Sequence, residues 1–437
     1  MTSSPSWPAS ILDAIFLAID PQMGQIEAHA CLDLTLDLTL DQIHQALAAT
    51  VVDLPVLGCC YTAHPIRDRW VPSSAPISDA VFVESDTDDL DMATRRWLSR
   101  PLDPRLNRPI RIVWMPHPDG GCRLLVTLLH IVVDGGGMMA IAQVFGAHLL
   151  GIHPQLPIDT RRGPELALER LPRSAWPLAI AAGLRELLQP LKLLGADPMP
   201  TLQGPNPNSP PCWTTIVLEP DALAHFKATC KAQGATINDG LVAVLARIVG
   251  RRRSKGPLTA IYTIDLRRYL NPPRLVVANL SALLMIAIPR AHLHHPNDAI
   301  AAVAAAQRQL DPRFRSLIFG WLPALVERLV HFEPFRQFVA IWGTAHATWV
   351  LSRALVVTNV GRLDEGLAIF GDHLVDLAII GPTARNLPMP VTAAWGLHGK
   401  LHLHLFGPPG TDPDRLQALA DEIRDGLTTP QSSPSDP

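Results

Sequence analysis

The stretch that decides the fold runs from Cys122 to Gly137 and reads CRLLVTLLHIVVDGGG. Residues 122–129 form a nearly unbroken apolar run, which predicts a strand buried on both faces. His130 follows directly, and Asp134 comes four residues later, ahead of three glycines. The apolar residues of 138–150 then recur at helical spacing, so the sequence predicts a strand, a short loop and a helix.

His130 and Asp134 are the candidate catalytic residues. The glycine run predicts a sharp turn that leaves the His130 side chain exposed where the strand ends. A buried carboxylate needs a partner, so we expect Asp134 to pair with an arginine and to fix the loop rather than to carry a proton. A histidine placed in this way can act as a general base near neutral pH. The simpler interpretation is a structural histidine at the end of a strand.

Strand and helix patterns also surround this stretch. From Leu32 to Leu38 leucines alternate with polar residues, which predicts a half-buried strand. Thr39 and Gln42 then form a capping box for a helix, so 26–51 is predicted to be a strand followed by a helix.

The second half of the chain repeats this alternation. Thr236 and Asp239 predict a helix start, and His398-Gly399 predicts the turn of a hairpin. The predicted elements are helices at 220–233, 236–251, after Asn297 and after Asp412, and strands at 262–265, 283–288, 353–358, 391–397 and 400–406.

A proline-rich crossover, 151–212, joins the two halves. Within it, 176–194 reads as a mostly apolar helix that packs on the core or rests on a membrane surface. The sequence therefore predicts an N-terminal α/β subdomain at 1–150, the crossover at 151–212 and a C-terminal subdomain at 213–437.

Composition excludes several classes of protein. The 437 residues carry a net charge of −3, which gives no electrostatic footprint for a nucleic-acid-binding protein. No apolar stretch reaches the roughly 18 residues that cross a bilayer. The first basic residue is Arg67, so no secretory signal is expected. Six cysteines without CxxC spacing indicate no disulfide scaffold. We therefore expect a cytoplasmic protein.

The stretch His130-Ile-Val-Val-Asp134-Gly135 resembles the HxxxDG motif of the acyltransferase superfamily that includes chloramphenicol acetyltransferase. That superfamily also holds the condensation domains of nonribosomal peptide synthetases, wax-ester synthases and polyketide-associated acyltransferases. Further resemblances occur in the same order along nearly the whole chain, from about residue 10 to 427. These are the segments 101–111 (PLD…PIR), 236–239 (TIND), 262–267 (YTIDLR) and 358–363 (TNVGRL).

The sequence departs from the family pattern at three places. Leu129 replaces the first histidine of the condensation-domain motif HHxxxDG, which favours an ester-forming branch. Gly58 stands where the family often has an arginine that pairs with the motif aspartate, and we assign that pairing to Arg267. Asn279 matches the asparagine of the family's "GN", but Ala278 replaces the glycine.

The resemblance implies an α/β, two-layer fold in which two chloramphenicol-acetyltransferase-like subdomains of one chain form a pseudo-dimer. The active-site channel would lie between the subdomains, and the protein would be a monomer. It implies an acyl thioester donor, carried by coenzyme A or by the phosphopantetheine arm of an acyl-carrier protein, and an alcohol or amine acceptor. His130 would act as general base and Asp134 would support it, with Gly135, Arg267 and Asn359 around the site. No permanently bound cofactor and no metal are expected.

Other patterns have simpler interpretations. The basic run 251–255 is interpreted as a solvated helix end rather than a phosphate or carrier-protein contact. His292, His294 and His295, and the pair His402 and His404, are interpreted as surface histidines because no acid or cysteine accompanies them at metal spacing. Asn359 and Gly361 are expected to form a turn at a strand end.

Three functions remain open besides ester formation from a thioester. The first is an amide-forming condensation enzyme that uses carrier-bound donors. The second is a catalytically silent module that docks carrier proteins. The third is a peripheral membrane enzyme acting on lipid alcohols, which draws on the mean hydropathy of +0.17 and the apolar crossover helix.

Overall fold

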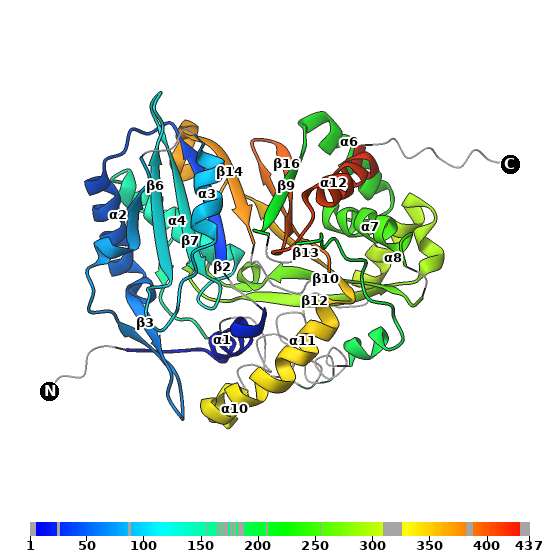
Figure 1. The fold of residues 1–437 in the computed structure, drawn as a ribbon, viewed down its shortest axis with the longest axis horizontal. Helices are drawn as coiled ribbons and strands as arrows, with labels where there is room; N and C mark the ends of the chain where they lie inside the picture. The colour runs from blue at the N-terminus through cyan, green and yellow to red at the C-terminus, as the bar shows by residue number, and fades with distance from the viewer. Residues whose placement is uncertain are drawn as a thin grey trace.

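A computed structural model describes residues 6–428 except 24–26, 86–88, 155, most of 164–187, 207–208, 254, 309–325 and 382–387. Two α/β halves lie side by side, with helices α1, α10 and α11 below the junction between them (Figure 1). The predicted crossover helix at 176–194 lies largely outside the described residues. Near its predicted end, the chain forms a 3₁₀ helix at Gln189–Leu193.

The N-terminal half is built on a five-stranded sheet with the order β14-β2-β7-β6-β5. Helices α2 and α4 pack together, and their buried residues join the core beneath this sheet. The elements are α1 (Ile11–Met23), β2 (Glu27–Leu34), α2 (Leu40–Asp53), β5 (Val81–Val83), α3 (Leu90–Leu98), β6 (Ile110–Pro116), β7 (Cys122–Leu129) and α4 (Gly135–Leu149). A small sheet of β1 (Trp7–Pro8), β4 (Arg69–Pro72) and β3 (Cys59–Thr62) flanks them.

The C-terminal half contains a six-stranded sheet with the order β12-β10-β13-β15-β16-β9. Helices α6, α7, α8 and α12 contribute to its core. The strands are β9 (Cys212–Leu218), β10 (Leu258–Asp265), β12 (Ser281–Ile288), β13 (Ala354–Arg362), β15 (Val391–Leu397) and β16 (Lys400–Gly407). The helices are α6 (Pro220–Ala232), α7 (Ile237–Gly250), α8 (Pro296–Arg308), α10 (Phe332–Phe338), η8 (Val339–Gly343), α11 (Thr344–Leu351) and α12 (Pro413–Thr428).

One strand crosses between the halves. Strand β14 (Leu374–Ile380) comes from the C-terminal part of the chain but pairs antiparallel with β2 in the N-terminal sheet, from Leu374 opposite Leu34 to Ile380 opposite His29. A second link is the pairing of β8 (Ile158–Asp159) with β11 (Leu275–Val276). The N-terminal sheet is therefore not made from 1–150 alone.

Most sequence-predicted elements are confirmed. Both capping boxes are present, with Thr39 and Gln42 at α2 and with Thr236 and Asp239 at α7. The hairpin turns at His398, whose φ is 51°, and Gly399, whose φ is 72°.

Two details of the sequence analysis are wrong. Strand β2 is not half-buried: it lies inside the sheet between β14 and β7, and the chain leaves the sheet after Leu34, before the leucine alternation ends. Helix α8 begins at Pro296, so Asn297 lies in its first turn rather than before it.

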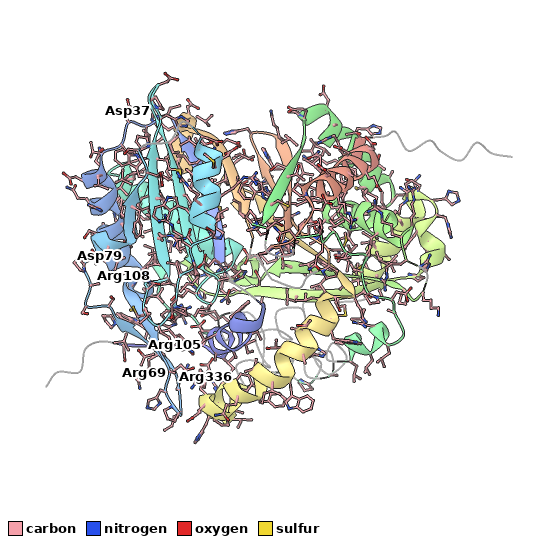
Figure 2. All side chains as sticks on the ribbon, in the orientation of Figure 1. Asp37, Arg69, Asp79, Arg105, Arg108 and Arg336 are labelled. Atoms are coloured by element: carbon pink, nitrogen blue, oxygen red, sulfur yellow. The ribbon has the colours of Figure 1, made fainter. Side chains whose placement is uncertain are left out.

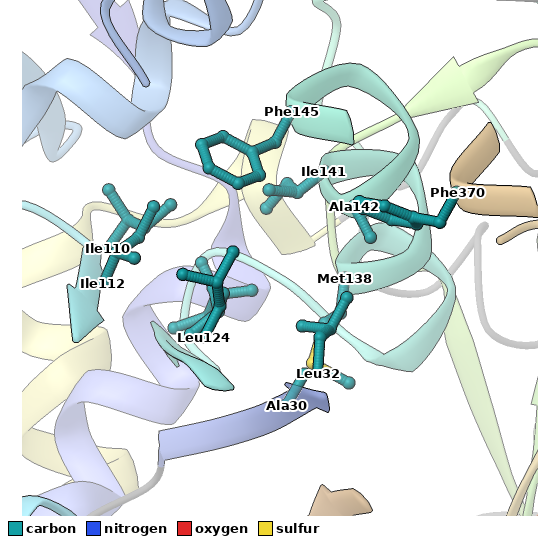
Figure 3. A pocket seen from close by; sticks show the side chains of 12 residues that line it. Ala30, Leu32, Ile110, Ile112, Leu124, Met138, Ile141, Ala142, Phe145 and Phe370 are labelled. Atoms are coloured by element: carbon teal, nitrogen blue, oxygen red, sulfur yellow. The ribbon is translucent and has the colours of Figure 1, made fainter. Parts of the chain in front are cut away.

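Between the N-terminal sheet and α4 lies an internal void of about 20 Å³ (Figure 3). Its lining is entirely apolar, including Leu124, Met138, Phe145 and Phe370. A cavity of this size could hold one water, but a buried water needs two or more polar partners. The void is therefore a packing feature of the core and not a substrate site.

Candidate active site

His130 lies at the junction of strand β7 and helix α4. The strand ends at Leu129, the chain turns through a hydrogen bond from Val132 N to Leu129 O (2.9 Å), and Asp134 caps α4 by accepting from Gly137 N (2.9 Å). The side chain of His130 is half-buried rather than exposed.

Asp134 is 1% exposed and is held from both halves of the chain. Its Oδ1 lies 2.8 Å from Nη1 of Arg267, and its Oδ2 accepts from Leu280 N (2.7 Å) and Ser281 Oγ (2.9 Å). A carboxylate with this many donors is fixed in place, which fits a supporting role better than proton transfer. The arginine expected beside Asp134 is thus present.

Arg267 binds more than the aspartate. Its Nη2 donates to the carbonyl oxygens of Ala278 (2.7 Å) and Val276 (3.1 Å), and its Nη1 lies 3.1 Å from Oδ1 of Asp265. One guanidinium therefore joins the motif loop, residues 130–134 between β7 and α4, to the segment between β11 and β12. Its planar fork of donors reaches several acceptors at once.

Asn279 holds the backbone of the motif loop. Its Nδ2 donates to His130 O and to Ile131 O, both at 3.0 Å. The sequence matched this residue to the family only by position, and the structure shows what its side chain does. The amide fixes the two peptide units that follow the histidine.

The glycine run acts differently from the sharp turn that the sequence predicted. Gly135, Gly136 and Gly137 form the first turn of α4, and none of them has a positive φ. A Cβ on Gly136 would lie 2.6 Å from Nη1 of Arg267, and one on Gly137 would lie 2.5 Å from Val133 Cγ2. Small residues are needed here so that Arg267 can approach the helix.

The environment of His130 favours a neutral imidazole. Phe16 of α1 stacks on the imidazole, with 5.1 Å between ring centroids and 22° between planes. Burial lowers the pKa of His130 below its ordinary value of 6.5, although the nearby carboxylate of Asp134 opposes this shift. A neutral imidazole can accept a proton at neutral pH, which is what a general base requires.

Asn359 and Gly361 form a β-bulge in β13. The register with β15 shifts between them, Asn359 Oδ1 accepts from Gly361 N (2.8 Å), and Gly361 has a φ of 91°. The bulge places Val360 next to Gly135, at 3.5 Å from the position of an added Cβ. Asn359 therefore shapes the wall beside α4, and its side chain has a local structural bond.

A cavity of about 200 Å³ lies beside the Asp134–Arg267 pair and is lined by residues of both halves. Gly136, Met139 and Gln143 of α4 form one wall, and Val360 and Arg362 of β13 lie on another. Arg267, Arg274 and the carboxylate of Asp265 also belong to the lining. Arg267 is already paired with Asp134 and Asp265, and Arg274 with Asp159 and Glu169. An extended group that carries an anion would therefore meet apolar walls and the guanidinium of Arg362, whose partner Glu365 is exposed.

The other candidate patterns lie away from this site. In the basic run, Arg252 pairs with Glu422 and the buried Arg253 donates to Asp197 O. His292, His294 and His295 are exposed, as expected. No group of three metal-binding side chains occurs among the residues that the structure describes.

The interpretation of His402 and His404 as surface residues is wrong. His402 is 9% exposed and His404 is fully buried. Trp395 stacks on His402 (5.5 Å), and Trp213 and Phe406 stack on His404. These aromatic residues come from β9, β15 and β16, and a single sequence does not reveal that they meet.

Three residues that the sequence analysis missed also contact the site: Phe16, Ser281 and Arg162, which donates to Val132 O (3.1 Å). No local motif marks Phe16 or Arg162, because each reaches the loop from a distant segment. The segment from Leu266-Arg267 to Ala278-Asn279, singled out by its resemblance to the family pattern, did point to the neighbourhood of Ser281.

No protein-family model and no curated protein matches this sequence. Solved structures do match in fold over nearly the whole chain. Trichothecene 15-O-acetyltransferase TRI3 from Fusarium sporotrichioides superposes with a TM-score of 0.67 and 12% identity, covering 97% of this chain and 95% of that one. The first condensation domain of the calcium-dependent antibiotic synthetase gives 0.66 and 15%, covering 99% and 98%.

The chain has the fold that this acetyltransferase and this condensation domain share. Polyketide synthase associated protein 5 from Mycobacterium tuberculosis shares it, with a TM-score of 0.60, 14% identity and 97% and 99% of the two chains covered. The condensation-type fold is pseudo-dimeric, which agrees with the two α/β halves seen here. The expected fold class is thus confirmed, while the roles of His130, Asp134, Gly135, Arg267 and Asn359 in catalysis stay predictions.

Proposed function

We propose that this protein is an acyltransferase that moves an acyl group from a thioester to a hydroxyl acceptor, with His130 as general base. One observation carries the proposal: His130 stands at the junction of the two halves on a loop that both halves hold. Asn279 fixes the backbone at His130, and Arg267, Leu280 and Ser281 fix Asp134. Such preorganisation is what a base needs to remove a proton at the moment of attack.

A single base can carry out both proton transfers of the reaction. The acceptor O–H gives its proton to the His130 imidazole while the oxygen attacks the thioester carbonyl. The tetrahedral intermediate collapses, the C–S bond breaks, and the imidazolium returns the proton to the departing thiolate. Ester and thiol leave, and His130 is neutral again. No acyl-enzyme is required.

We place the donor in the cavity beside the Asp134–Arg267 pair. Both coenzyme A and a carrier-protein arm present a pantetheine chain with a phosphate, and the cavity offers apolar walls and the guanidinium of Arg362 for these two parts. Arg362 is 77% exposed and pairs only with the equally exposed Glu365 among the ion pairs of the described residues, so it is available to a phosphate.

The ester is favoured over the amide because Leu129 replaces the first histidine of HHxxxDG. The fold is shared with an enzyme named for O-acetyl transfer as well as with condensation domains. An amide-forming enzyme with carrier-bound donors is the second candidate, and a silent docking module is the third.

The deciding experiment measures thiol release by the purified protein. Acyl-coenzyme A and acyl-carrier-protein donors are offered with pooled alcohols and amines, and His130→Ala is compared with the wild type. We expect acceptor-dependent release that falls by about 10² or more in His130→Ala, and the product mass separates ester from amide. Release that is equal in the variant would exclude His130 as the base, and no release from either donor class would favour the docking module.

The pH profile gives a second test of the base. The pKa of His130 is lowered, so the neutral form predominates at pH 7 and is lost as pH falls through that lowered value. We therefore expect kcat/KM to be flat around pH 7 and to fall only below pH 6.5. A profile that loses activity already above pH 7 would contradict a base that is neutral at pH 7.

We also propose that helix α10 and the helical turn η8 that follows it contact a lipid surface. Phe338, Ile341 and Trp342 are exposed by 59%, 66% and 66% and lie at helical spacing on the outer face of this helical segment. Two basic residues, Arg69 and Arg336, lie along the same lower edge of the molecule (Figure 2). Helix α10 is joined to the β3–β4 connection at this edge, because Phe332 N donates to Ile66 O. No helix among the described residues is long and apolar enough to span a membrane.

Flotation with vesicles tests this contact. The wild type is mixed with vesicles rich in anionic lipid and compared with the double variant Ile341→Asn/Trp342→Gln. We expect the variant to lose most of the floating fraction, because buried apolar area drives interfacial binding. Leu106→Asn, at an exposed apolar residue outside these helices, is the matched control. Equal flotation of all three proteins would exclude the α10–η8 surface.

A further inference from the structure

A second buried arginine, Arg162, holds the motif loop in addition to Asn279 and Arg267. Arg162 lies in the crossover just after β8, and its guanidinium donates to Val132 O (3.1 Å) and to Val277 O (3.2 Å). The motif loop and the segment after β11 are thus bound by one side chain that belongs to neither. Its side chain is 6% exposed.

The charge of Arg162 is neutralised by Asp13 of helix α1. Nη1 of Arg162 lies 3.0 Å from Asp13 Oδ2, and Nη2 lies 3.3 Å from Oδ1. Asp13 is 1% exposed and also accepts from Ser10 Oγ (2.8 Å) and Trp70 Nε1 (2.8 Å). These bonds fix the first turn of α1 relative to the motif loop.

One turn further along α1, Phe16 covers His130. Residues three apart lie on neighbouring positions of a helix surface, so the helix that Arg162 holds through Asp13 is the helix that presents the stacked ring. The contacts form a closed path. Arg162 binds Val132 O and pairs with Asp13, and α1 carries both Asp13 and Phe16. Phe16 in turn stacks on the imidazole of His130, which lies on the same loop as Val132. Phe16 also packs against Val391 of β15, in an apolar cluster that Leu351 of α11 joins.

We propose that Arg162 and Asp13 are positioning residues that set the Phe16 ring on His130 and thereby fix the orientation of the imidazole and limit its contact with water. The part of this inference that concerns turnover rests on the proposed function. A buried ion pair is weak evidence for a purely stabilising role, because apolar groups of the same volume often serve as well, although removal of one partner alone destabilises the fold. A small displacement of a base can cost about 10²-fold in rate.

Other charged groups on the elements around His130 do not explain such a role. Asp134 lies on the same loop and is paired with Arg267, and Glu27 at the start of β2 lies opposite Leu129. Neither Asp134 nor Glu27 is on α1, so neither controls the stacked ring.

The test uses three variants and one control, each assayed for kcat, KM and the pH profile. Arg162→Met removes the bond to Val132 and the ion pair, Phe16→Leu removes the stacked ring, and Phe16→Tyr keeps the ring as the conservative variant. Arg253→Met is the matched control, because Arg253 is also buried and also donates to a crossover carbonyl, that of Asp197, but lies at the end of α7.

We expect Arg162→Met and Phe16→Leu to lower kcat at least tenfold while KM changes less than threefold. In both variants water reaches His130 more easily, so its pKa rises toward 6.5 and the acid limb of the profile moves to higher pH. Phe16→Tyr should keep the wild-type profile. Arg253→Met should lower the melting temperature without moving the acid limb.

A readout independent of activity separates this inference from the proposed function. Protein labelled at histidine Cε1 is titrated by NMR, and the His130 signal is identified by its loss in His130→Ala. We expect its titration midpoint to rise in Arg162→Met and Phe16→Leu but not in Arg253→Met. If the wild type turns over no thioester, the proposed function fails while this titration still decides the inference. An unchanged His130 midpoint in well-folded Phe16→Leu would overturn it, even if Arg162→Met does not fold.

Discussion

A methyl group added to Gly136 would lie 2.6 Å from Nη1 of Arg267 and 2.8 Å from Oδ2 of Asp265, whereas one added to Gly135 would meet only Val360, at 3.5 Å. Two neighbouring glycines in one helical turn therefore differ in what they tolerate. The difference lies in the approach of Arg267, which pairs with Asp134 through the space that Gly136 leaves open.

We predict that Gly136→Ala displaces Arg267 and costs about 1–3 kcal/mol in the free energy of unfolding, together with a loss of activity. Gly135→Ala should stay within about 0.5 kcal/mol of the wild type, because an ordinary contact replaces open space. Urea denaturation of both variants at pH 7 measures the difference. Equal stabilities would show that Arg267 can move without loss.

Residue chemistry made part of the site predictable. A buried aspartate must find a cation, and the departure at Gly58 pointed to Arg267, where the ion pair is found. The same reasoning could not reach Arg162, because its partners are backbone oxygens of Val132 and Val277, which any sequence supplies. Phe16 was equally hidden, since stacking depends on how α1 packs and not on a motif.

Strands β9 and β16 bury a histidine between aromatic rings. His404 is fully buried, bonds through Nδ1 to Thr215 Oγ1 (3.0 Å), and lies among Trp213, Trp395 and Phe406. Burial lowers the pKa of His404 from 6.5 to about 3. The folded element thus resists protonation, while the unfolded chain takes up the proton below pH 6.5.

From this shift we predict the pH dependence of stability. Between pH 6.5 and the lowered pKa, the unfolded state binds one more proton at His404, so stability falls as pH falls, by at most about 1.4 kcal/mol per pH unit. His404→Gln should flatten this slope, and the exposed His292→Gln should not. Urea midpoints measured from pH 6.5 to 4.5 give the slopes; a steeper slope in His404→Gln would contradict the assignment.

At the scale of elements, the sequence was most reliable where the signal is local. Capping boxes and the His398-Gly399 turn depend on neighbours in the chain, and all are present. The burial of β2 and of His404 was missed because each depends on a strand or ring from elsewhere in the chain, β14 in the first case and Trp213 in the second.

The two halves of the molecule depend on each other through β14. Its residues Leu377 and Ile379 are buried in the core of the N-terminal half, although more than half the length of the chain separates them from the end of that half in sequence. The halves also share a cluster in which Phe406 and Trp213 meet Trp97 and Val113. The motif residues thus lie on a frame that neither half completes alone.

We predict that Leu377→Asp raises hydrogen exchange in β2 and β7 as well as in β14, because an unpaired buried charge opens the shared sheet. Val375→Asp is the matched control: Val375 is 58% exposed and lies at the bulge of β14. Exchange followed by mass spectrometry compares the two variants. Protection of β2 that survives in Leu377→Asp would show that the N-terminal sheet is stable without this strand.

The position of β14 also sets a delay during synthesis on the ribosome. Strands β2 and β7 emerge early, but the strand that covers the free edge of β2 is translated roughly 240 residues after β7, which at about 5–20 residues per second is on the order of 10–50 s. During that interval the nascent chain exposes an unpaired edge that invites pairing with other chains. Production of this protein should therefore respond to translation speed and to chaperones that shield nascent strands.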